Sequence, residues 1–257
     1  MFSLANTALS VAVVLPAYNE SQLLAATVES LPDFIDFIVI VDDCSTDETA
    51  MVAESLTDPR VRLVRHVKNK GVGAAIVTGY IEVLDSAADI AVVMGADGQM
   101  LPGEIRTLLD PIARGQADYV KGNRLLCDRA RTLMPFMRWI GTSILSAMTR
   151  HATGLHHIGD SQCGFTAISR KALLRLDLTK LYERYGYPND LLSLAAIESL
   201  RVVDVPVTPI YGSERSDLHI RKVVFPITAL LVRALLRRMF NSRSRRQTAE
   251  IHFEETS

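Results

Sequence analysis

Short apolar runs, often β-branched, recur through the first part of the chain, and a turn or polar residue follows each run. Runs of this length predict buried strands, and the apolar residues at helical spacing between them predict helices. Alternation of this kind predicts an α/β fold, with a mainly parallel sheet and helices on both faces. The predicted strands are Val11–Leu15, Phe37–Val41, Val61–Arg65 and Ile90–Met94.

The same patterns continue, less regularly, beyond the fourth strand. They predict further helices over Pro102–Arg114, Leu133–Thr153 and Leu191–Ser199, and further strands over Asp118–Lys121, Thr166–Ser169 and Arg201–Pro206. The sequence shows no internal repeat and no low-complexity linker. We therefore expect one domain over residues 1–215 and a C-terminal extension over residues 216–257, with a disordered tail.

Two of the early helices begin near residues that favour caps. Asn19 precedes the first helical pattern, which predicts an N-cap there. Ser45 and Glu48 have the spacing of a capping box for a helix over Asp47–Ser55.

Oxygen-bearing side chains follow three of the first four strands. Glu20 follows the first strand, Asp42 and Asp43 end the second, and Asp97 and Gln99 follow the fourth. Ligands of open α/β sheets bind at the carboxyl ends of the strands, so we expect these side chains to meet there. Carboxylate and amide oxygens suit a hard cation such as Mg²⁺ or Mn²⁺. The alternative for each residue alone is a polar turn or a helix cap.

A glycine-rich turn, Gly71-Val72-Gly73, opens the helix after the third strand. Such a turn could belong to a dinucleotide-binding fingerprint. However, the third glycine position is Ile76, and the acidic strand end at Asp42 and Asp43 precedes the turn instead of following it. The pattern therefore argues against an NAD-dependent dehydrogenase.

Charge and cysteine content indicate the kind of partner and the cellular compartment. The net charge of the chain is −1, yet residues 201–246 hold ten Lys and Arg against three Asp and Glu, which argues for an anionic partner such as a phosphate or a membrane surface. Cys44, Cys127 and Cys163 form neither a zinc spacing nor a disulfide framework, which favours a reducing compartment. The N-terminus lacks the basic region of a signal peptide, and we expect no nucleic-acid partner.

The C-terminal stretch Val223–Phe240 is apolar but short. Pro226 and Arg233 interrupt it, and it falls below the roughly 20 apolar residues that a spanning helix needs. Arginines follow it, so residues 223–246 are typical of a helix that lies on an anionic membrane surface. The alternative is a helix packed on the domain, followed by a solvated basic tail.

Seven short motifs occur in a characteristic order. They are Pro16-Ala17-Tyr18-Asn19-Glu20, Asp42-Asp43-x-Ser45-x-Asp47, Asn69-x-Gly71-x-Gly73, Ala96-Asp97-Gly98-Gln99, Gly122-Asn123-Arg124, Asp160-x-Gln162-x-Gly164-Phe165 and Asn189-Asp190. With these motifs the chain resembles the family 2 glycosyltransferases, most of all the branch of dolichol-phosphate mannose synthase and other polyprenyl-phosphate glycosyltransferases. The resemblance implies a GT-A fold, a UDP- or GDP-linked sugar donor, a divalent cation and inversion at the anomeric carbon.

The resemblance also implies roles for single residues. Pro16, Tyr18, Glu20, Asp42, Asp43, Gly71 and Gly73 would surround the nucleotide, and Asp97 and Gln99 would hold Mg²⁺ or Mn²⁺. Arg124 would meet a phosphate, Asp190 would lie near the acceptor, and Arg215 belongs to a basic loop beside the substrates. One departure is Gly95, where the family often has an acidic residue.

Three functions remain open from the sequence. The first is a transferase on the cytoplasmic face of a membrane that moves a hexose to a polyprenyl phosphate or another membrane-associated acceptor, in cell-envelope glycan synthesis. The second is a soluble glycosyltransferase that acts on a hydroxyl acceptor, for which Asp190 would be the general base. The third is a nucleotide-binding protein without catalysis.

Overall fold

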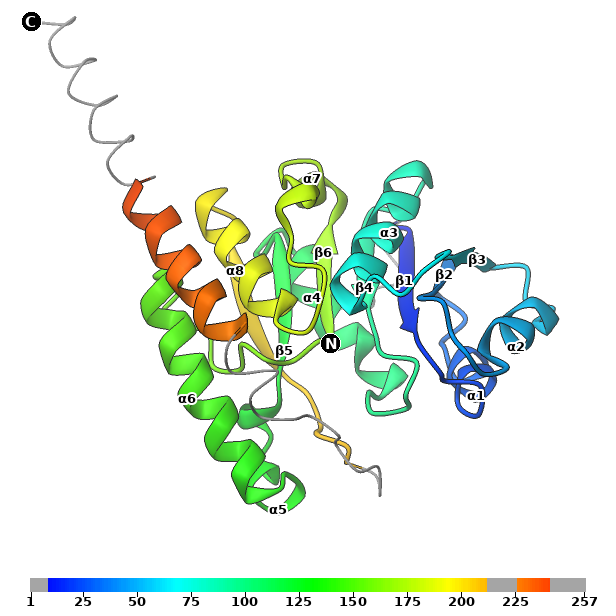
Figure 1. Ribbon diagram of the computed structural model, residues 1–257, viewed down its shortest axis with the longest axis horizontal. Helices are drawn as coiled ribbons and strands as arrows, with labels where there is room; N and C mark the ends of the chain where they lie inside the picture. The colour runs from blue at the N-terminus through cyan, green and yellow to red at the C-terminus, as the bar shows by residue number, and fades with distance from the viewer. Residues whose placement is uncertain (1–8, 212–225, 241–257) are drawn as a thin grey trace, which may run out of the picture.

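A seven-stranded sheet forms the centre of the protein (Figure 1), in the order β3-β2-β1-β4-β6-β5-β7. The computed structural model describes residues 9–211 and 226–240. The strands are β1 (Val11–Ala17), β2 (Phe37–Asp42), β3 (Val61–Arg65), β4 (Ile90–Val93), β5 (Tyr119–Asn123), β6 (Thr166–Ser169) and β7 (Val202–Pro206). β6 pairs antiparallel with β4 and β5, and the other pairs are parallel. The predicted α/β fold with a mainly parallel sheet is confirmed.

Helices connect the strands and extend the chain beyond them. They are α1 (Leu24–Glu29), α2 (Thr49–Ser55), α3 (Val72–Asp85), α4 (Ile105–Ala113), α5 (Ala130–Leu133), α6 (Phe136–Thr153), α7 (Arg170–Leu173) and α8 (Tyr187–Ile197), with 3₁₀ turns η2 (Pro102–Glu104), η3 (Arg124–Leu126) and η4 (Leu178–Lys180). The chain is also helical over residues 226–240, which we call the terminal helix.

The helix that the sequence predicts over Leu133–Thr153 is divided in two. α5 ends at Leu133 and α6 begins at Phe136, on either side of Pro135. Met134 is extended, with φ −86° and ψ 133°, as expected for a residue before proline. Pro135 therefore starts α6 instead of lying inside a longer helix.

Two apolar clusters cover the two faces of the sheet. Along β1, Val11, Val13 and Leu15 belong to one cluster, and Ala12 and Val14 belong to the other, as strand alternation requires. The first cluster includes residues of α1, α2 and α4, and the second includes residues of α3, α7 and α8. Helices therefore cover both faces, as predicted.

The terminal helix packs outside this layered core, beside α6 and α8 (Figure 1). Its buried apolar residues are Ile227, Leu230, Leu231 and Ala234, and all of these except Leu230 form a small cluster with Ala152 of α6. The described part of the extension thus lies on the domain. Several of its other residues remain exposed.

The predicted caps near β1 and β2 are wrong. α1 begins at Leu24, and Asn19 has a positive φ of 59° and accepts a hydrogen bond from the Thr46 N–H at 2.8 Å. Ser45 Oγ accepts from the Asn19 N–H at 3.0 Å and caps no helix. α2 begins at Thr49, whose N–H donates to Asp47 Oδ1 at 2.9 Å. These polar residues join the loops after β1 and β2 to each other.

Strand direction determines where the functional side chains gather. Ala17 at the end of β1 pairs with Asp42 at the end of β2, and Val14 pairs with Val93 at the end of β4. β5 is antiparallel to β6, which is antiparallel to β4, so β5 ends at the same edge. The segments that follow β1, β2, β4 and β5 therefore all begin at the same edge of the sheet.

The packing of α3 on β1 gives a test of the fold. A Cβ at Gly79 would overlap Val14 Cγ1, so α3 would have to move away from the sheet. We expect Gly79→Ala to lower the free energy of unfolding by about 1–3 kcal/mol, although alanine favours helix. The matched control is Gly141→Ala in α6, where an added Cβ would have no described atom within 4 Å apart from the adjacent residues and the backbone of its own helix.

For Gly141→Ala we expect a gain of about 0.5–1 kcal/mol from helix propensity alone. Urea denaturation of both variants measures the difference. A Gly79→Ala protein as stable as the wild type would show that α3 does not approach β1 this closely.

Candidate active site

A cavity of about 1060 Å³ opens where the carboxyl ends of β1, β4 and β5 meet. The start of α3, the beginning of α6 and the loop before α8 complete its wall. Among the residues that line it are eight that the sequence predicted, namely Pro16, Tyr18, Glu20, Asp43, Gly71, Asp97, Gln99 and Arg124. The fold thus gathers into one cavity side chains that lie far apart in the sequence.

Asp43 is held in place at this cavity by several donors. Its Oδ1 accepts the Lys70 N–H at 2.9 Å, and its Oδ2 accepts the Gly71 N–H at 2.7 Å. His66 Nδ1 lies 2.7 Å from the same Oδ1, and because an ionised carboxylate only accepts, this nitrogen donates. His66 Nε2 lies 2.9 Å from Thr78 Oγ1. The sequence analysis did not select His66, although it directly follows the third strand.

Asp42 has a different position from its neighbour. Its side chain is buried and does not line the cavity. Asp42 Oδ1 accepts the Ser45 N–H at 3.0 Å, and Oδ2 lies 3.6 Å from Arg65 Nε. The structure therefore brings Asp43 to the cavity and uses Asp42 to hold the loop after β2.

Gly71 and Gly73 allow two walls of the cavity to approach each other. Gly71 has φ +99°, and an added Cβ there would lie 2.7 Å from the Glu183 carbonyl oxygen. A Cβ at Gly73 would overlap the Tyr182 carbonyl oxygen. The Ala74 N–H donates to the Glu183 carbonyl at 2.9 Å. Gly71 lines the cavity and Gly73 does not, so the second glycine serves this close packing.

Asp97 and Gln99 supply the oxygens that could hold a cation. The Gln99 N–H donates to Asp97 Oδ1 at 3.0 Å. A Cβ at Gly95 would lie 2.8 Å from that same oxygen, so the Asp97 carboxylate occupies space beside the missing side chain. No group of three His, Cys, Asp or Glu in the described ranges could hold a metal by itself. One carboxylate with an amide fits Mg²⁺, which usually takes its other ligands from substrate phosphates and water.

Arg124 is fixed by an ion pair with Asp160. Arg124 Nε donates to Asp160 Oδ2 at 2.7 Å, and Nη2 donates to Oδ1 at 3.1 Å. Burial of Asp160 favours its neutral form, but the Arg124 charge and hydrogen bonds outweigh burial and lower the pKa of the carboxyl. Burial likewise opposes the Arg124 charge, and Asp160 raises the pKa of the guanidinium. The pair is charged, and Arg124 has one fixed orientation.

The cavity is also lined by arginines and tyrosines that the sequence motifs did not indicate. Arg138 lies in α6, with its Cζ 5.0 Å from the centre of the Tyr211 ring. Tyr185, which is 47% exposed, lines the same cavity as Arg124 and Arg138. Arg184 also lines the cavity. Arg184 and Tyr185 lie shortly before the Asn189-Asp190 motif, whereas no local pattern indicates Arg138.

Asp190 does not line the cavity among the described residues. It is buried in the first turn of α8, where it pairs with Arg233 and Arg237 of the terminal helix. The predicted Arg215 lies outside the described residues, as do residues 223–225 and 241–246 of the predicted membrane segment.

Sequence comparison finds relatives that are named as glycosyltransferases. A UDP-N-acetylglucosamine–dolichyl-phosphate N-acetylglucosaminyltransferase from Methanococcus voltae is 32% identical over 214 residues, which cover 77% of this chain and 85% of that protein. An undecaprenyl-phosphate mannosyltransferase from Micrococcus luteus is 29% identical over 203 residues, which cover 77% and 82%.

Among solved structures, glucosyl-3-phosphoglycerate synthase from Mycobacterium tuberculosis, in complex with Mn²⁺, UDP and glucosyl-3-phosphoglycerate, has a similar fold. The TM-score is 0.67 at 21% identity, and the match covers 89% of this chain and 80% of that one. The family model described as Glycosyl transferase family 2 matches residues 12–176, which run from β1 through β6. The chain therefore belongs to glycosyltransferase family 2 and is a glycosyltransferase with the GT-A fold.

Proposed function

We propose that this protein transfers a hexose from a nucleotide-diphosphate sugar to a polyprenyl phosphate, with inversion at the anomeric carbon. The observation that carries the proposal is the composition of the cavity, which has carboxylates at the strand ends and several arginines and tyrosines from segments after β5. The printed names of the Methanococcus and Micrococcus relatives include dolichyl and undecaprenyl phosphate. Those names support a lipid phosphate as the acceptor of this chain.

The donor nucleotide would lie against Pro16, Tyr18 and Asp43. A carboxylate oxygen can accept two hydrogen bonds, and Asp43 Oδ2 accepts one, from the Gly71 N–H. This oxygen thus retains an acceptor position for a base N–H or a ribose hydroxyl. His66 and the Lys70 N–H hold the carboxylate in one orientation for that contact.

Asp97 and Gln99 would hold Mg²⁺ or Mn²⁺ beside the donor diphosphate. A cation there supplies charge neutralisation for the departing nucleoside diphosphate. The structural neighbour with Mn²⁺ and UDP in its complex supports this assignment. Asp97 is the only carboxylate between Gly95 and Gln99, so most of the protein's contribution to the cation would come from it.

The acceptor phosphate would meet Arg124, with Arg138 and Arg184 as further cations on the wall. A planar guanidinium suits a phosphate, and Asp160 already fixes the orientation of Arg124. A phosphate oxygen is anionic at neutral pH, so it can attack the anomeric carbon without giving up a proton. The bond between that carbon and the donor diphosphate breaks on the opposite face. This reaction needs no general base, which agrees with an Asp190 that lies away from the cavity.

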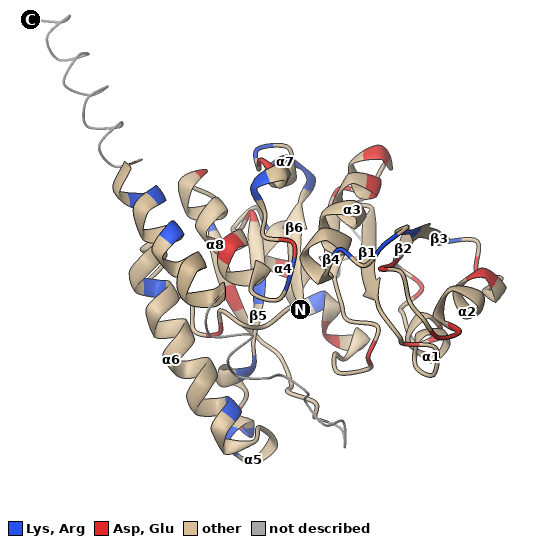
Figure 2. Cartoon of the chain, viewed as in Figure 1, with Lys and Arg blue, Asp and Glu red and all other residues tan. Residues whose placement is uncertain are grey.

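A lipid acceptor also requires contact with a membrane surface. Phe136 and Met137 at the start of α6 are 70% and 75% exposed, and Phe240 on the terminal helix is 64% exposed. Figure 2 shows the arginines of these two helices in blue, and their described residues include no Lys, Asp or Glu. No helix in residues 9–211 and 226–240 is long and apolar enough to cross a bilayer. We infer that the exposed parts of α6 and the terminal helix that carry Phe136, Met137 and Phe240, which we call the outer face, lie on an anionic membrane.

Donor and cation binding can be tested without knowing the acceptor. A ligand that binds only the native state at 100 times its dissociation constant stabilises it by about 2.7 kcal/mol. We therefore expect one UDP- or GDP-sugar to raise the melting temperature by several degrees in a thermal-shift screen with Mn²⁺. Asp97→Asn should remove the increment that depends on Mn²⁺, because the amide loses the charge that holds the cation.

The matched control is Asp85→Asn, an exposed aspartate at the end of α3. It should keep the full shift. A Mn²⁺-dependent shift that survives Asp97→Asn would place the cation elsewhere, and no shift with any donor would contradict the proposed function.

Membrane contact can be tested by flotation with phosphatidylglycerol vesicles. Phe136→Glu and Phe240→Glu each place a negative charge on the outer face, so we expect a smaller fraction of each variant to float with the vesicles. Val67→Glu introduces the same charge after β3, where Val67 is 94% exposed, and should float like the wild type. Equal flotation of all four proteins would mean that this face does not contact the membrane.

A further inference from the structure

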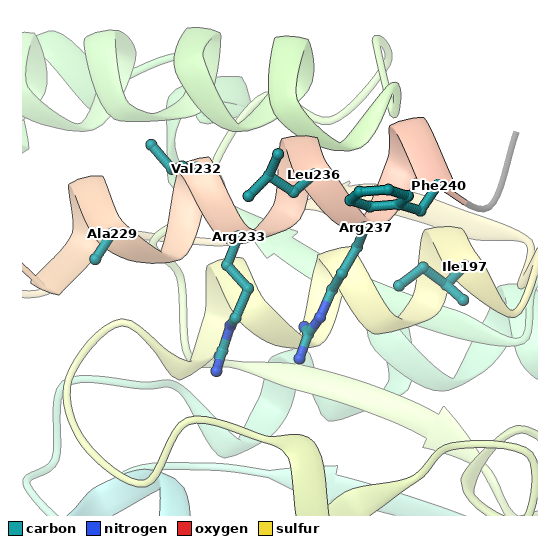
Figure 3. Close-up of a pocket in the computed structure, with 7 residues that line it drawn as sticks. All are labelled: Ile197, Ala229, Val232, Arg233, Leu236, Arg237 and Phe240. Carbon is teal, nitrogen blue, oxygen red and sulfur yellow. The ribbon is translucent and has the colours of Figure 1, made fainter. Parts of the chain in front are cut away.

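A single buried carboxylate joins the terminal helix to the wall of the cavity. Arg237 Nη1 donates to Asp190 Oδ1 at 2.8 Å, and Arg233 Nη2 lies 2.6 Å from Asp190 Oδ2. The two arginines are four residues apart, so they share one face of the terminal helix. Figure 3 shows both side chains pointing from this helix toward α8 and the loop before it. The Asp190 side chain is fully buried between them.

The third partner of Asp190 belongs to the cavity wall. The Tyr182 N–H donates to Asp190 Oδ2 at 2.8 Å. Tyr182 begins a segment, residues 182–188, that we call the acceptor loop, and most of its residues line the cavity. Asp190 therefore binds the terminal helix with both oxygens and the acceptor loop with one of them.

The terminal helix touches the acceptor loop at a second point. Gly186 has φ +113°, and an added Cβ there would lie 2.9 Å from Leu230 Cδ1 of the terminal helix. On its other side the loop packs on the start of α3, where the Ala74 N–H donates to the Glu183 carbonyl. The acceptor loop is thus enclosed between α3, which borders the donor end, and the terminal helix.

The apolar contact of the terminal helix is small. The ion pairs of Arg233 and Arg237 with Asp190 therefore contribute to holding this helix on the domain. Its buried cluster with α6 has few residues, and beside Arg233 and Arg237 lies an open groove of about 670 Å³ (Figure 3). The side chains of the groove other than the two arginines are apolar, namely Ile197, Ala229, Val232, Leu236 and Phe240. If the helix left, Asp190 would keep only the Tyr182 N–H and the favourable end of the α8 dipole. The carboxylate of Asp190 therefore links docking of the terminal helix to order in the acceptor loop.

We propose that Asp190 is a positioning residue, which with Arg233 and Arg237 fixes the acceptor loop to the docked terminal helix. The acceptor end of the cavity is then complete only while that helix is in place. The kinetic consequence rests on the proposed function, but the structural link does not. Since the helix also belongs to the face that we assign to the membrane, docking at the membrane would favour the ordered acceptor loop.

The alternative is that Asp190 acts as a general base. A base must come within hydrogen-bond reach of the acceptor hydroxyl. Here Oδ1 is bound to Arg237, Oδ2 is bound to Arg233 and Tyr182, and neither oxygen faces the cavity. The arrangement favours positioning.

The test compares the double variant Arg233→Gln/Arg237→Gln with Arg238→Gln in the full chain. Arg238 lies on the same helix, but its Nη1 donates to the His151 carbonyl of α6 at 2.8 Å and not to Asp190. In amide hydrogen exchange followed by mass spectrometry, we expect peptides over residues 182–188 to exchange about tenfold faster in the double variant. Asp190→Asn should give the same change. The variant Arg233→Gln/Arg237→Lys keeps one charged donor to Asp190, so it should regain most of the protection that the double Gln variant loses.

In Arg238→Gln, protection of the loop should stay within about twofold of the wild type. The link through Asp190 is overturned if loop exchange is unchanged in the double variant, or if Arg238→Gln accelerates it equally. Exchange needs no turnover, so this result stands even if the protein transfers no sugar to any acceptor.

Kinetics form the second arm, with undecaprenyl phosphate in vesicles as acceptor and the donor that gives the largest thermal shift. We expect the double variant to raise the acceptor KM about tenfold and to change the donor KM less than about twofold. Loss of rate and of the acid limb of the pH profile in Asp190→Asn alone, with the arginine variants active, would show a general base instead. Absence of transfer by the wild type would contradict the proposed function and leave the exchange result to decide the positioning role.

Discussion

The carboxyl ends of β1, β2 and β4 meet at one edge of the sheet because these strands are parallel and paired in a fixed register. Ala17 lies opposite Asp42, and Val14 lies opposite Val93. β1 is buried on both faces, with Val13 and Leu15 in one cluster and Ala12 in the other, so a shift of one residue would exchange side chains of different size between two packed clusters. The same register places Tyr18, Asp43 and Asp97 around one cavity. The donor end is in this sense a consequence of core packing.

The acceptor end has no comparable single origin. Arg124 follows β5, Arg138 lies in α6, and Tyr185 lies in the loop before α8. Two kinds of contact bring these segments together, namely the buried ion pair of Arg124 with Asp160 and the glycine contacts of α3 with the acceptor loop. This end therefore depends on side-chain charges and close backbone approach more than on strand register.

This difference explains how much of the structure could be predicted. The alternating strands and helices, and the residues just after β1, β2 and β4, could be read from the sequence because strand ends are local features. Arg138 could not be selected, because only tertiary packing brings α6 to the cavity. The caps assigned to Asn19 and Ser45 failed for a related reason, since these side chains bond across two loops instead of within their own helix. The break at Pro135 was within reach of the sequence, since proline disfavours the interior of a helix.

The order of the lining residues along the chain has a consequence for how such a protein can change. In the proposed function, the lining residues from 16–100 form the donor end, and the remaining lining residues, from Arg124 onward, form the acceptor end. Recognition of the two substrates is thus divided between two consecutive lengths of one polypeptide. Substitutions in the second length could alter the acceptor while the first is inherited unchanged. The two lengths of chain contact each other where Gly71 and Gly73 approach Tyr182 and Glu183. A chimera that combines one length from each of two relatives would have to preserve this contact.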